Sequence, residues 1–319
     1  MRLHTTATGA GAGLRKGGFL AELSVNRILY LMALPGIIFM LVFNYLPMTG
    51  LYISFTEFNP MKGIFGSKFV GLRNFEFFFT GLDWPRVTWN TIYLNFLFIA
   101  GEISCSILLA IMLNEIAGKV FVRVTQSIII LPYFVSWAIV GMFSVTLLAS
   151  EGGMVNDLFK ALGLQPVSFY TSPEAWPVIL VLIRIWKGAG YGTIIFLATM
   201  AGINKELYES ARIDGASRLQ MIRLITLPLL KSTTILLVLL ALGRVFYGDF
   251  GMIYALVGDN SFLFQTTDVI DTFVFRSLRS LGDFGMAAAV GLYQSLVGMV
   301  LVIGSNMLVK AYDPDVTLY

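Results

Sequence analysis

The stretch Glu209-Ser-Ala-Arg-Ile-Asp-Gly215-Ala-Ser-Arg-Leu-Gln-Met-Ile-Arg-Leu-Ile225-Thr-Leu-Pro228 is a polar segment set between long apolar runs. It lies inside the region 203–230, which has the pattern of a short charged helix, a glycine break and a second amphipathic helix. Gly215 suits the break because glycine adopts the left-handed conformation that reverses a chain at little cost. The stretch therefore predicts a structured loop that joins two apolar segments.

Capping signals indicate where the two helices of this loop begin. Asn204 precedes the first helix, and Glu206 falls in its first turn, where an acidic side chain is favourable. Ser217 followed by Gln220 is the pattern of a capping box at the start of the second helix. Pro228 is predicted to end that helix and to angle the chain into the next apolar segment.

Composition places the rest of the chain in a membrane. Of its 319 residues, 57% are hydrophobic and 13% are charged, against roughly 25% charged in soluble domains. We predict an all-α membrane protein, a polytopic bundle of six transmembrane helices, because a bilayer core takes about 20 helical residues to cross. Pro35 and Pro47 are expected to kink the first apolar run or to mark its ends. The six predicted spans are Ile28–Phe55, Trp89–Leu113, Val124–Ala149, Val178–Ala201, Ser232–Gly251 and Gly285–Val309.

The distribution of Lys and Arg predicts which side of the membrane each connection faces. Cytoplasmic connections carry an excess of these residues, and the excess here favours cytoplasmic N- and C-termini. The loop 203–230 is then cytoplasmic as well. We expect a flexible cytoplasmic tail over 1–26 and a transmembrane domain over 27–319. Two segments of the outer connections, Leu72–Thr80 and Asp268–Ser280, are predicted to form short interfacial helices.

The groups that carry most enzyme chemistry are absent from the sequence or badly placed. The single histidine, His4, lies in the polar tail, away from any expected core. No Gly-x4-Gly-Lys-Ser/Thr phosphate-binding loop occurs, so the chain is not expected to bind and split ATP itself. The single cysteine, Cys105, permits no intramolecular disulfide. We expect no enzyme, no bound metal or cofactor and no nucleic-acid partner, which leaves transport or scaffolding.

The polar loop also resembles a known motif. Its spacing Glu-x-Ala-x3-Gly-x9-Ile-x-Leu-Pro is similar to the EAA loop of permease subunits of ABC importers, the cytoplasmic coupling-helix loop on which the ATPase binds. Ser210 stands where that family usually has alanine, and serine is nearly as small. An ordinary helix–turn–helix connection between spans is the alternative. The resemblance implies these ATPase-coupling residues: Glu209, Ser210, Ala211, Asp214, Gly215, Ala216, Leu227 and Pro228.

The resemblance continues over most of the chain. Leu34-Pro35-Gly36, Phe69–Phe75 and Ile185–Gly188 look like motifs of sugar permeases of the maltose-permease class. Within that class, Trp186–Ala198 and the C-terminal segment 313–319 resemble the branch that serves oligosaccharides, including alginate fragments and aldouronates.

Such a resemblance implies an assembly in the inner membrane. This chain and a related second permease subunit would form the pathway as a heterodimer, and two ATPase subunits would bind ATP and Mg beneath it. An extracytoplasmic solute-binding protein would deliver an oligosaccharide, either neutral or acidic. Closure of the ATPase subunits would drive alternating access through the coupling helix around 209–215.

Ionisable residues inside the spans indicate where substrate passes, because charges are costly in lipid and usually face a cavity or a partner. The resemblance implies sugar contacts from the fourth span and from the outer half of the fifth. A guanidinium binds a carboxylate through two hydrogen bonds, and a tyrosine ring stacks on a sugar, so both suit an acidic oligosaccharide. The predicted substrate-pathway residues are Arg184, Lys187, Gly188, Tyr191, Arg244, Tyr247 and Gly248.

A structural role is the alternative for two of these cations. Arg184 is a candidate partner for Glu102 or Asp249, and Lys187 for a backbone carbonyl. The alternative for the whole protein is a secondary transporter or channel that acts without an ATPase. That class predicts inverted repeats with broken helices at matching positions, a symmetry that the sequence does not display.

Overall fold

The computed structural model describes residues 26–116 and 118–312, whose regular structure is almost entirely helical. The chain divides into two compact units, Met1–Tyr52 and Ile53–Tyr319. Apart from Asn26, the predicted tail lies outside the described residues, as does the C-terminal motif 313–319.

The first unit contains one helical run that changes type along its length. It comprises α2 (Arg27–Met40), the π-helix η1 (Leu41–Tyr45) and the start of the 3-10 helix η2 (Leu46–Phe55). The whole run of 29 residues is long and apolar enough to cross a membrane. Neither Pro35 nor Pro47 ends it. The π-helix η1 directly precedes this region. Its wider turn tolerates Pro47, which has no backbone N–H to donate.

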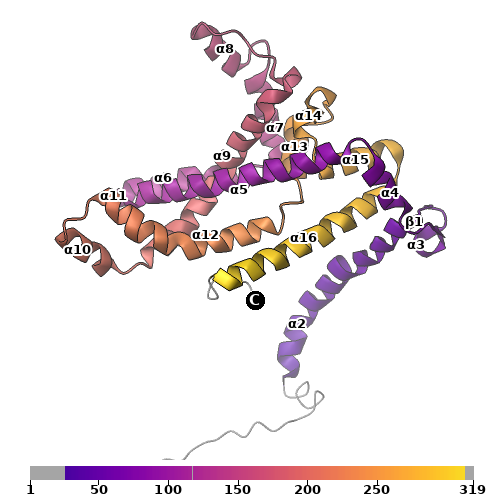
Figure 1. Ribbon diagram of the computed structural model, residues 1–319, viewed down its shortest axis with the longest axis horizontal. Coiled ribbons are helices and arrows are strands. Elements are labelled where there is room, and N and C mark those ends of the chain that lie inside the picture. Colours follow the sequence, from indigo (N-terminus) through magenta and orange to yellow (C-terminus); the bar gives the residue numbers. More distant parts are fainter. Residues whose placement is uncertain (1–25, 117, 313–319) are drawn as a thin grey trace, which may run out of the picture. The chain divides into compact units, whose positions relative to one another are not determined.

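The second unit is built on four long helices. They are α5 (Trp84–Asn114), α9 (Trp176–Ala201), α12 (Leu227–Leu242) and α16 (Phe284–Tyr312). Helices α5, α12 and α16 lie side by side, and α9 packs along α5 (Figure 1). A Cβ atom at Gly188 would meet the Glu102 carboxylate, and one at Gly192 would meet the Ser106 hydroxyl. Small residues on α9 therefore let the two helices approach closely.

Shorter elements connect the long helices. The strands β1 and β2 pair antiparallel, with Thr56 opposite Phe69. Helices form within both segments predicted to be interfacial, as α4 and α15. The shorter elements are β1 (Thr56–Glu57), α3 (Gly63–Gly66), β2 (Lys68–Phe69), α4 (Arg73–Thr80), α6 (Lys119–Ile130), η3 (Leu131–Phe134), α7 (Trp137–Leu148), α8 (Met154–Ala161), η4 (Phe169–Thr171), η5 (Pro173–Ala175), α10 (Lys205–Ile213), α11 (Arg218–Met221), η6 (Ile222–Thr226), α13 (Phe250–Val257), η7 (Ser261–Leu263), α14 (Phe264–Thr267) and α15 (Ile270–Leu281).

Within the described residues, five helices are long and apolar enough to cross a membrane, or six if the bent pair counts as one span. This bent pair corrects the third predicted span. Lys119–Phe134 and Trp137–Leu148 meet at 95° instead of forming one straight helix. The backbone is extended at Val135 and Ser136, and the Ser136 hydroxyl caps α7. Hydropathy could not reveal the break because both halves are apolar.

The fifth predicted span is also corrected. The helical run covers Arg218–Leu242 and is followed by the irregular segment 243–249, so the predicted span Ser232–Gly251 lies too far along the chain. The prediction that Pro228 ends the loop helix is wrong. It occupies the first turn of α12, directly after the π-helix η6. The loop helix and the span are thus one continuous helical element.

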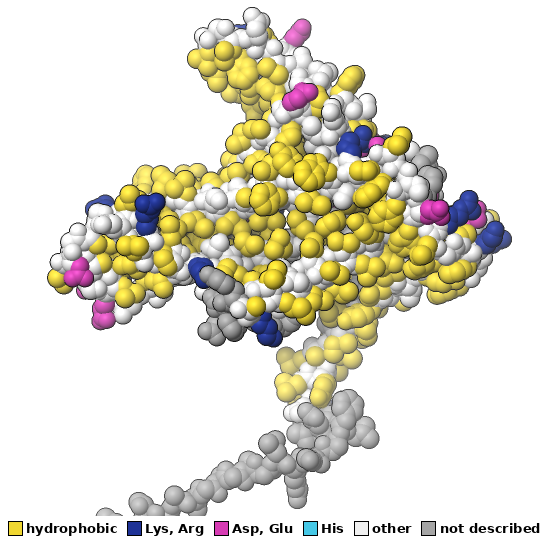
Figure 2. All heavy atoms as spheres, viewed as in Figure 1, with side chains coloured by type: hydrophobic (Ala, Val, Ile, Leu, Met, Phe, Trp, Pro, Cys, Tyr) yellow, Lys and Arg dark blue, Asp and Glu magenta, His cyan; other side chains and the backbone are white. Residues whose placement is uncertain are grey.

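Apolar side chains dominate the outside of the second unit as well as its interior. Figure 2 shows them covering the face formed by α5, α12 and α16, with charged side chains gathered toward the ends of these helices. Inside, α5, α7, α9 and α13 share a core that includes Leu94, Val140, Trp176 and Met252. Apolar surfaces on both sides of the helices are expected of a bundle in lipid.

Candidate transport site and coupling loop

The loop between α9 and α12 has the capped structure that its sequence predicts. The Asn204 side-chain oxygen Oδ1 accepts the N–H of Glu206 at 3.0 Å, at the start of α10. Gly215 has a φ of 83°, in the left-handed region that favours glycine. Ser217 and Gln220 make both hydrogen bonds of a capping box at the start of α11. These local interactions give the loop one defined shape.

This loop presents apolar side chains to its surroundings. Ile213 is 87% exposed, Leu219 63% and Leu224 74%. Glu209 and Asp214 are exposed beside them. An exposed apolar surface with charged residues around it is typical of a protein–protein contact. The loop is therefore a candidate docking surface.

One hydrogen bond ties the candidate docking surface to the fifth span. The Tyr208 hydroxyl of α10 lies 3.0 Å from the hydroxyl of Thr226, a buried residue directly before α12. Leu227 and Pro228 follow as the first residues of α12. This contact links α10 to the residue that directly precedes a long helix.

In α9, the Arg184 guanidinium lies between two carboxylates. Its Nε donates to Glu102 Oε2 of α5 at 3.0 Å, and its Nη1 donates to Asp249 Oδ2 at 2.6 Å. Asp249 also caps α13 by accepting the N–H of Met252 at 3.0 Å. Gly188 is buried, and its missing side chain leaves room for Glu102. Arg184 thus pairs with both of its candidate partners.

One turn further along α9, the Lys187 ammonium is held by backbone carbonyls. Its Nζ donates to the oxygens of Pro132 at 3.2 Å, Tyr133 at 2.7 Å and Val135 at 2.6 Å. It also lies 5.7 Å from the ring centroid of Tyr133 and 5.1 Å from that of Trp137, within cation–π range. All three ammonium protons therefore have acceptors.

Tyr191 is the most accessible of the predicted pathway residues on α9. Its side chain is 49% exposed, and its ring stacks on that of Tyr133 with centroids 5.0 Å apart. The sequence favours a lipid-facing or core role for Tyr133 over a place in the pathway. The pair offers a flat aromatic surface beside the Lys187 contacts.

Arg244 and Tyr247, predicted in the outer half of the fifth span, lie instead in the segment that follows α12. The Tyr247 hydroxyl lies 2.9 Å from Ser295 Oγ of α16. The Gly248 N–H donates to the Asp271 carboxylate of α15. The Arg244 guanidinium is exposed and makes no hydrogen bond or ion pair with any residue that the structure describes.

The sequence did not point to Asp271, whose carboxylate joins this segment to α15. Burial raises the pKa of the Asp271 carboxyl, and the hydrogen bonds from Gly248 and Gln294 oppose that rise. The Gln294 amide donates to the Phe246 carbonyl at 2.8 Å and to Asp271 at 3.4 Å. A lone acidic residue in a polar connection gives no signal of such burial.

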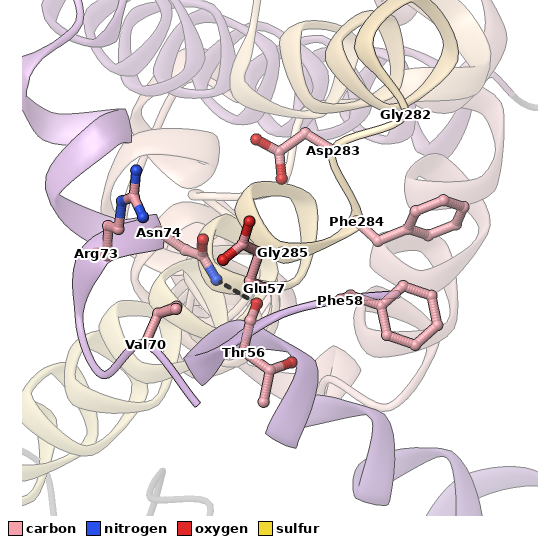
Figure 3. A pocket seen from close by; sticks show the side chains of 10 residues that line it. All are labelled: Thr56, Glu57, Phe58, Val70, Arg73, Asn74, Gly282, Asp283, Phe284 and Gly285. Carbon is pink, nitrogen blue, oxygen red and sulfur yellow. Dashed lines mark hydrogen bonds between the residues drawn. The ribbon is translucent and has the colours of Figure 1, made fainter. Parts of the chain in front are cut away.

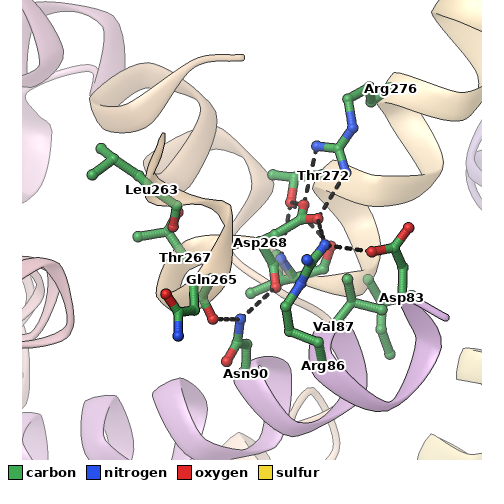
Figure 4. A network of polar contacts seen from close by, with 12 residues as sticks. Asp83, Arg86, Val87, Asn90, Leu263, Gln265, Thr267, Asp268, Thr272 and Arg276 are labelled. Atoms are coloured by element: carbon green, nitrogen blue, oxygen red, sulfur yellow. Dashed lines mark hydrogen bonds and ion pairs between the residues drawn. The ribbon is translucent and has the colours of Figure 1, made fainter. Parts of the chain in front are cut away.

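No signal in the sequence indicated a second polar cluster, which is centred on Asp268. Its buried carboxylate accepts two hydrogen bonds from Arg276, at 3.1 and 2.7 Å, and one from Thr272 at 2.9 Å (Figure 4). Arg86, at the start of α5, lies 3.3 Å from the same carboxylate, and Asn90 donates to the Asp268 carbonyl at 3.0 Å. The cluster holds α14 and α15 against α5.

A polar cavity of 420 Å³ lies between the β1–β2 hairpin, α4 and the start of α16. Glu57, Arg73 and Asp283 surround it (Figure 3). Asn74, at its edge, donates to the Thr56 carbonyl at 3.0 Å. None of the predicted coupling or pathway residues lines this cavity.

The long apolar helices, the broken span and the structured loop between α9 and α12 together define a polytopic α-helical membrane protein of the transporter type. Residues 102–317 match the family described as "Binding-protein-dependent transport system inner membrane component". The chain belongs to this family, and it is a permease subunit of an importer. This membership disfavours a secondary transporter or channel that acts without an ATPase.

Individual relatives match over nearly their full lengths. Protein LplB of Bacillus subtilis (strain 168) is 35% identical over 96% of this chain and 95% of its own length. The polygalacturonan/rhamnogalacturonan transport system permease protein YteP of the same organism is 36% identical over 93% and 92%. A chain of a bacterial ABC transporter involved in the import of the acidic polysaccharide alginate has a TM-score of 0.84 at 34% identity, covering 92% of this chain and 99% of that one. A chain of a bacterial alginate ABC transporter, solved in complex with an alginate pentasaccharide-bound periplasmic protein, has a TM-score of 0.84 at 34% identity, covering 92% of this chain and 98% of that one.

Proposed function

We propose that this chain is one of two permease subunits of an ATP-driven importer that moves oligosaccharides across the inner membrane by alternating access. The names of its relatives support a saccharide substrate, and alginate is an acidic one. We assign acidic oligosaccharides, of the uronate type, as the favoured substrate class. The termini and the loop 203–230 are assigned to the cytoplasm on the Lys and Arg distribution.

The partners in this proposal follow from the family and from its solved member. An extracytoplasmic solute-binding protein is supported by the alginate transporter, which was solved with a periplasmic protein carrying the pentasaccharide. A second permease and two ATPase subunits complete the assembly, and ATP and Mg bind to the ATPase subunits. In this arrangement, Glu209–Ala216 with Leu227 and Pro228 form the ATPase-coupling surface. This assignment rests on the exposure of Ile213, which is joined to α12 through α11.

The test of the proposed function is the ATPase activity that copurifies with this chain. With the solute-binding protein added, uronate oligosaccharides are expected to stimulate the activity more than neutral maltodextrins of similar length. Stimulation by neutral sugars alone would keep the importer and reject the acidic substrate. If no ATPase copurifies, the coupling role of the loop is wrong.

Among the predicted pathway cations, Arg244 is the best candidate to contact an acidic sugar. Arg184 is already paired with Glu102 and Asp249, and Lys187 donates to three carbonyls. Arg244 has no such partner in the described part of the chain. Gly248 and the exposed rings of Tyr191 and Tyr247 remain candidates for contact with sugar hydroxyls and faces.

Exchange of Arg244 for glutamine is therefore expected to weaken uptake of acidic oligosaccharides selectively. A hydrogen bond to a charged group contributes about 1.5–3 kcal/mol, so the apparent affinity should fall roughly tenfold or more. Initial rates of uptake into proteoliposomes, measured against substrate concentration, give this affinity. Arg244→Lys keeps the charge and should retain part of it. An equal loss for neutral oligosaccharides would show a structural role instead.

A further inference from the structure

The break in the third span leaves backbone carbonyls without helical partners. The last C=O groups of a helix have no N–H donor in the following turn. Here α6 and η3 end at Phe134, and α7 begins anew after Ser136. The Val135 carbonyl lies in this break and the Tyr133 carbonyl in the last turn of η3, next to that of Pro132, which also accepts the Val135 N–H at 3.1 Å. In lipid such groups need another partner, because water is absent.

Helix α9 is shaped to bring a cation to these carbonyls. A Cβ atom at Gly190 would collide with the Ile129 carbonyl at the end of α6, so the two backbones touch there. Lys187 lies one turn before Gly190 and reaches the three oxygens at 2.6 to 3.2 Å. The ring of Trp137, the first residue of α7, covers the ammonium from the far side of the break.

We propose that the Lys187 ammonium is a tethered cation that holds the third span in its bent form. We propose further that the carbonyl site accepts a free monovalent cation of similar size when the side chain is cut back to alanine. Lys187 is then a positioning residue, and its effect on transport acts through α7, which packs closely on α13. This inference does not depend on the identity of the substrate.

The chemistry of the site selects a monovalent cation. Rings of backbone carbonyls replace the hydration shell of monovalent ions in selectivity filters. Ca²⁺ favours carboxylate ligands, whereas the hydrogen-bond acceptors that the described residues offer at the Lys187 ammonium are three neutral carbonyls. The rings of Tyr133 and Trp137 favour K⁺, ammonium or methylammonium in addition, because aromatic faces attract such ions.

The test measures the bend directly in the full-length chain, purified with whatever subunits accompany it. Spin labels on Val124→Cys of α6 and Phe143→Cys of α7, both exposed positions, report the distance across the break in a Cys105→Ala background. With Lys187 present, we expect one narrow distance distribution in every salt. In Lys187→Ala, we expect a loss of the narrow distribution in N-methylglucamine chloride, and its return in KCl or methylammonium chloride at the same ionic strength.

Matched variants decide between outcomes. Lys160→Ala removes an exposed lysine of α8 and should leave the distribution narrow. Lys187→Met keeps most of the stem without the charge and should lose the narrow distribution. A narrow distribution in Lys187→Ala or Lys187→Met without any small cation would overturn the proposal. So would a distribution that stays broad in all salts, or failure to recover both variants folded in any of them, since a bound cation should stabilise the native state.

Discussion

Replacing Gly215 by proline is expected to reduce substrate-stimulated ATP hydrolysis to its unstimulated level and to abolish uptake. Gly215 has a φ of 83°, whereas proline holds φ near −65°. Proline would also remove the N–H that donates to the Arg212 carbonyl at 3.1 Å. The turn between α10 and α11 could not form, and the docking surface would be misdirected. Uptake and ATPase activity of the reconstituted complex measure this effect.

The damage should be confined to the loop, which makes the experiment interpretable. A side chain at Gly215 meets nothing within 4 Å, so the bundle should stay folded. Gly215→Asn is the matched control, because asparagine tolerates the left-handed conformation and should retain most of the coupling. Glu209→Lys changes the exposed surface without changing the turn and should weaken ATPase binding. Transport at the normal rate by Gly215→Pro would remove the coupling role from this loop.

Replacing Asp268 by alanine is expected to destabilise the chain by about 3–5 kcal/mol, the cost of removing one partner from a buried ion pair. The Asp268 side chain is fully buried, and its loss would leave Arg276 without its two hydrogen bonds. The Nε of Arg86 already lacks a partner within the described residues, so little compensation is available there. Thermal unfolding of the purified protein in detergent measures the loss.

A second arginine pair supplies the control for this stability prediction. Arg279 and Asp259 lie 3.1 Å apart, but their side chains are 62% and 47% exposed. Exposed pairs contribute about 0–1 kcal/mol, so Arg279→Ala should change the unfolding temperature little. Equal shifts for Arg279→Ala and Asp268→Ala would mean that burial of the Asp268 cluster does not govern its contribution.

Much of the helical bundle could be predicted because its signals lie within single segments. Five of the six predicted spans overlap a long helix, including α5, α9 and α16. The N-cap at Asn204 and the capping box at Ser217 were predicted correctly for the same reason, since each joins residues two or three positions apart. The predicted boundaries of the spans were less accurate than their existence. The helix of the fifth span begins in the polar loop, where hydropathy gives no indication of a span.

The pathway residues illustrate what sequence patterns leave open. Their chemistry suggested that Arg184 and Lys187 were either ligand contacts or structural cations. The structure favours structural contacts for both, and it leaves Arg244 exposed in an irregular segment. The coupling and pathway roles themselves stay predictions until the variants above are measured.

Composition and capping act over a few neighbouring residues, so the membrane class, the helical content and the local shape of the loop 203–230 follow from the sequence. The tertiary fold settles which groups pair with ionisable side chains, because the partners lie far apart in the sequence. Glu102 meets Arg184 across 82 residues, and Arg86 meets Asp268 across 182. The acceptors of Lys187 are backbone carbonyls, which every residue carries. Only the bend of the third span makes those of Tyr133 and Val135 available, so no residue type could have marked them.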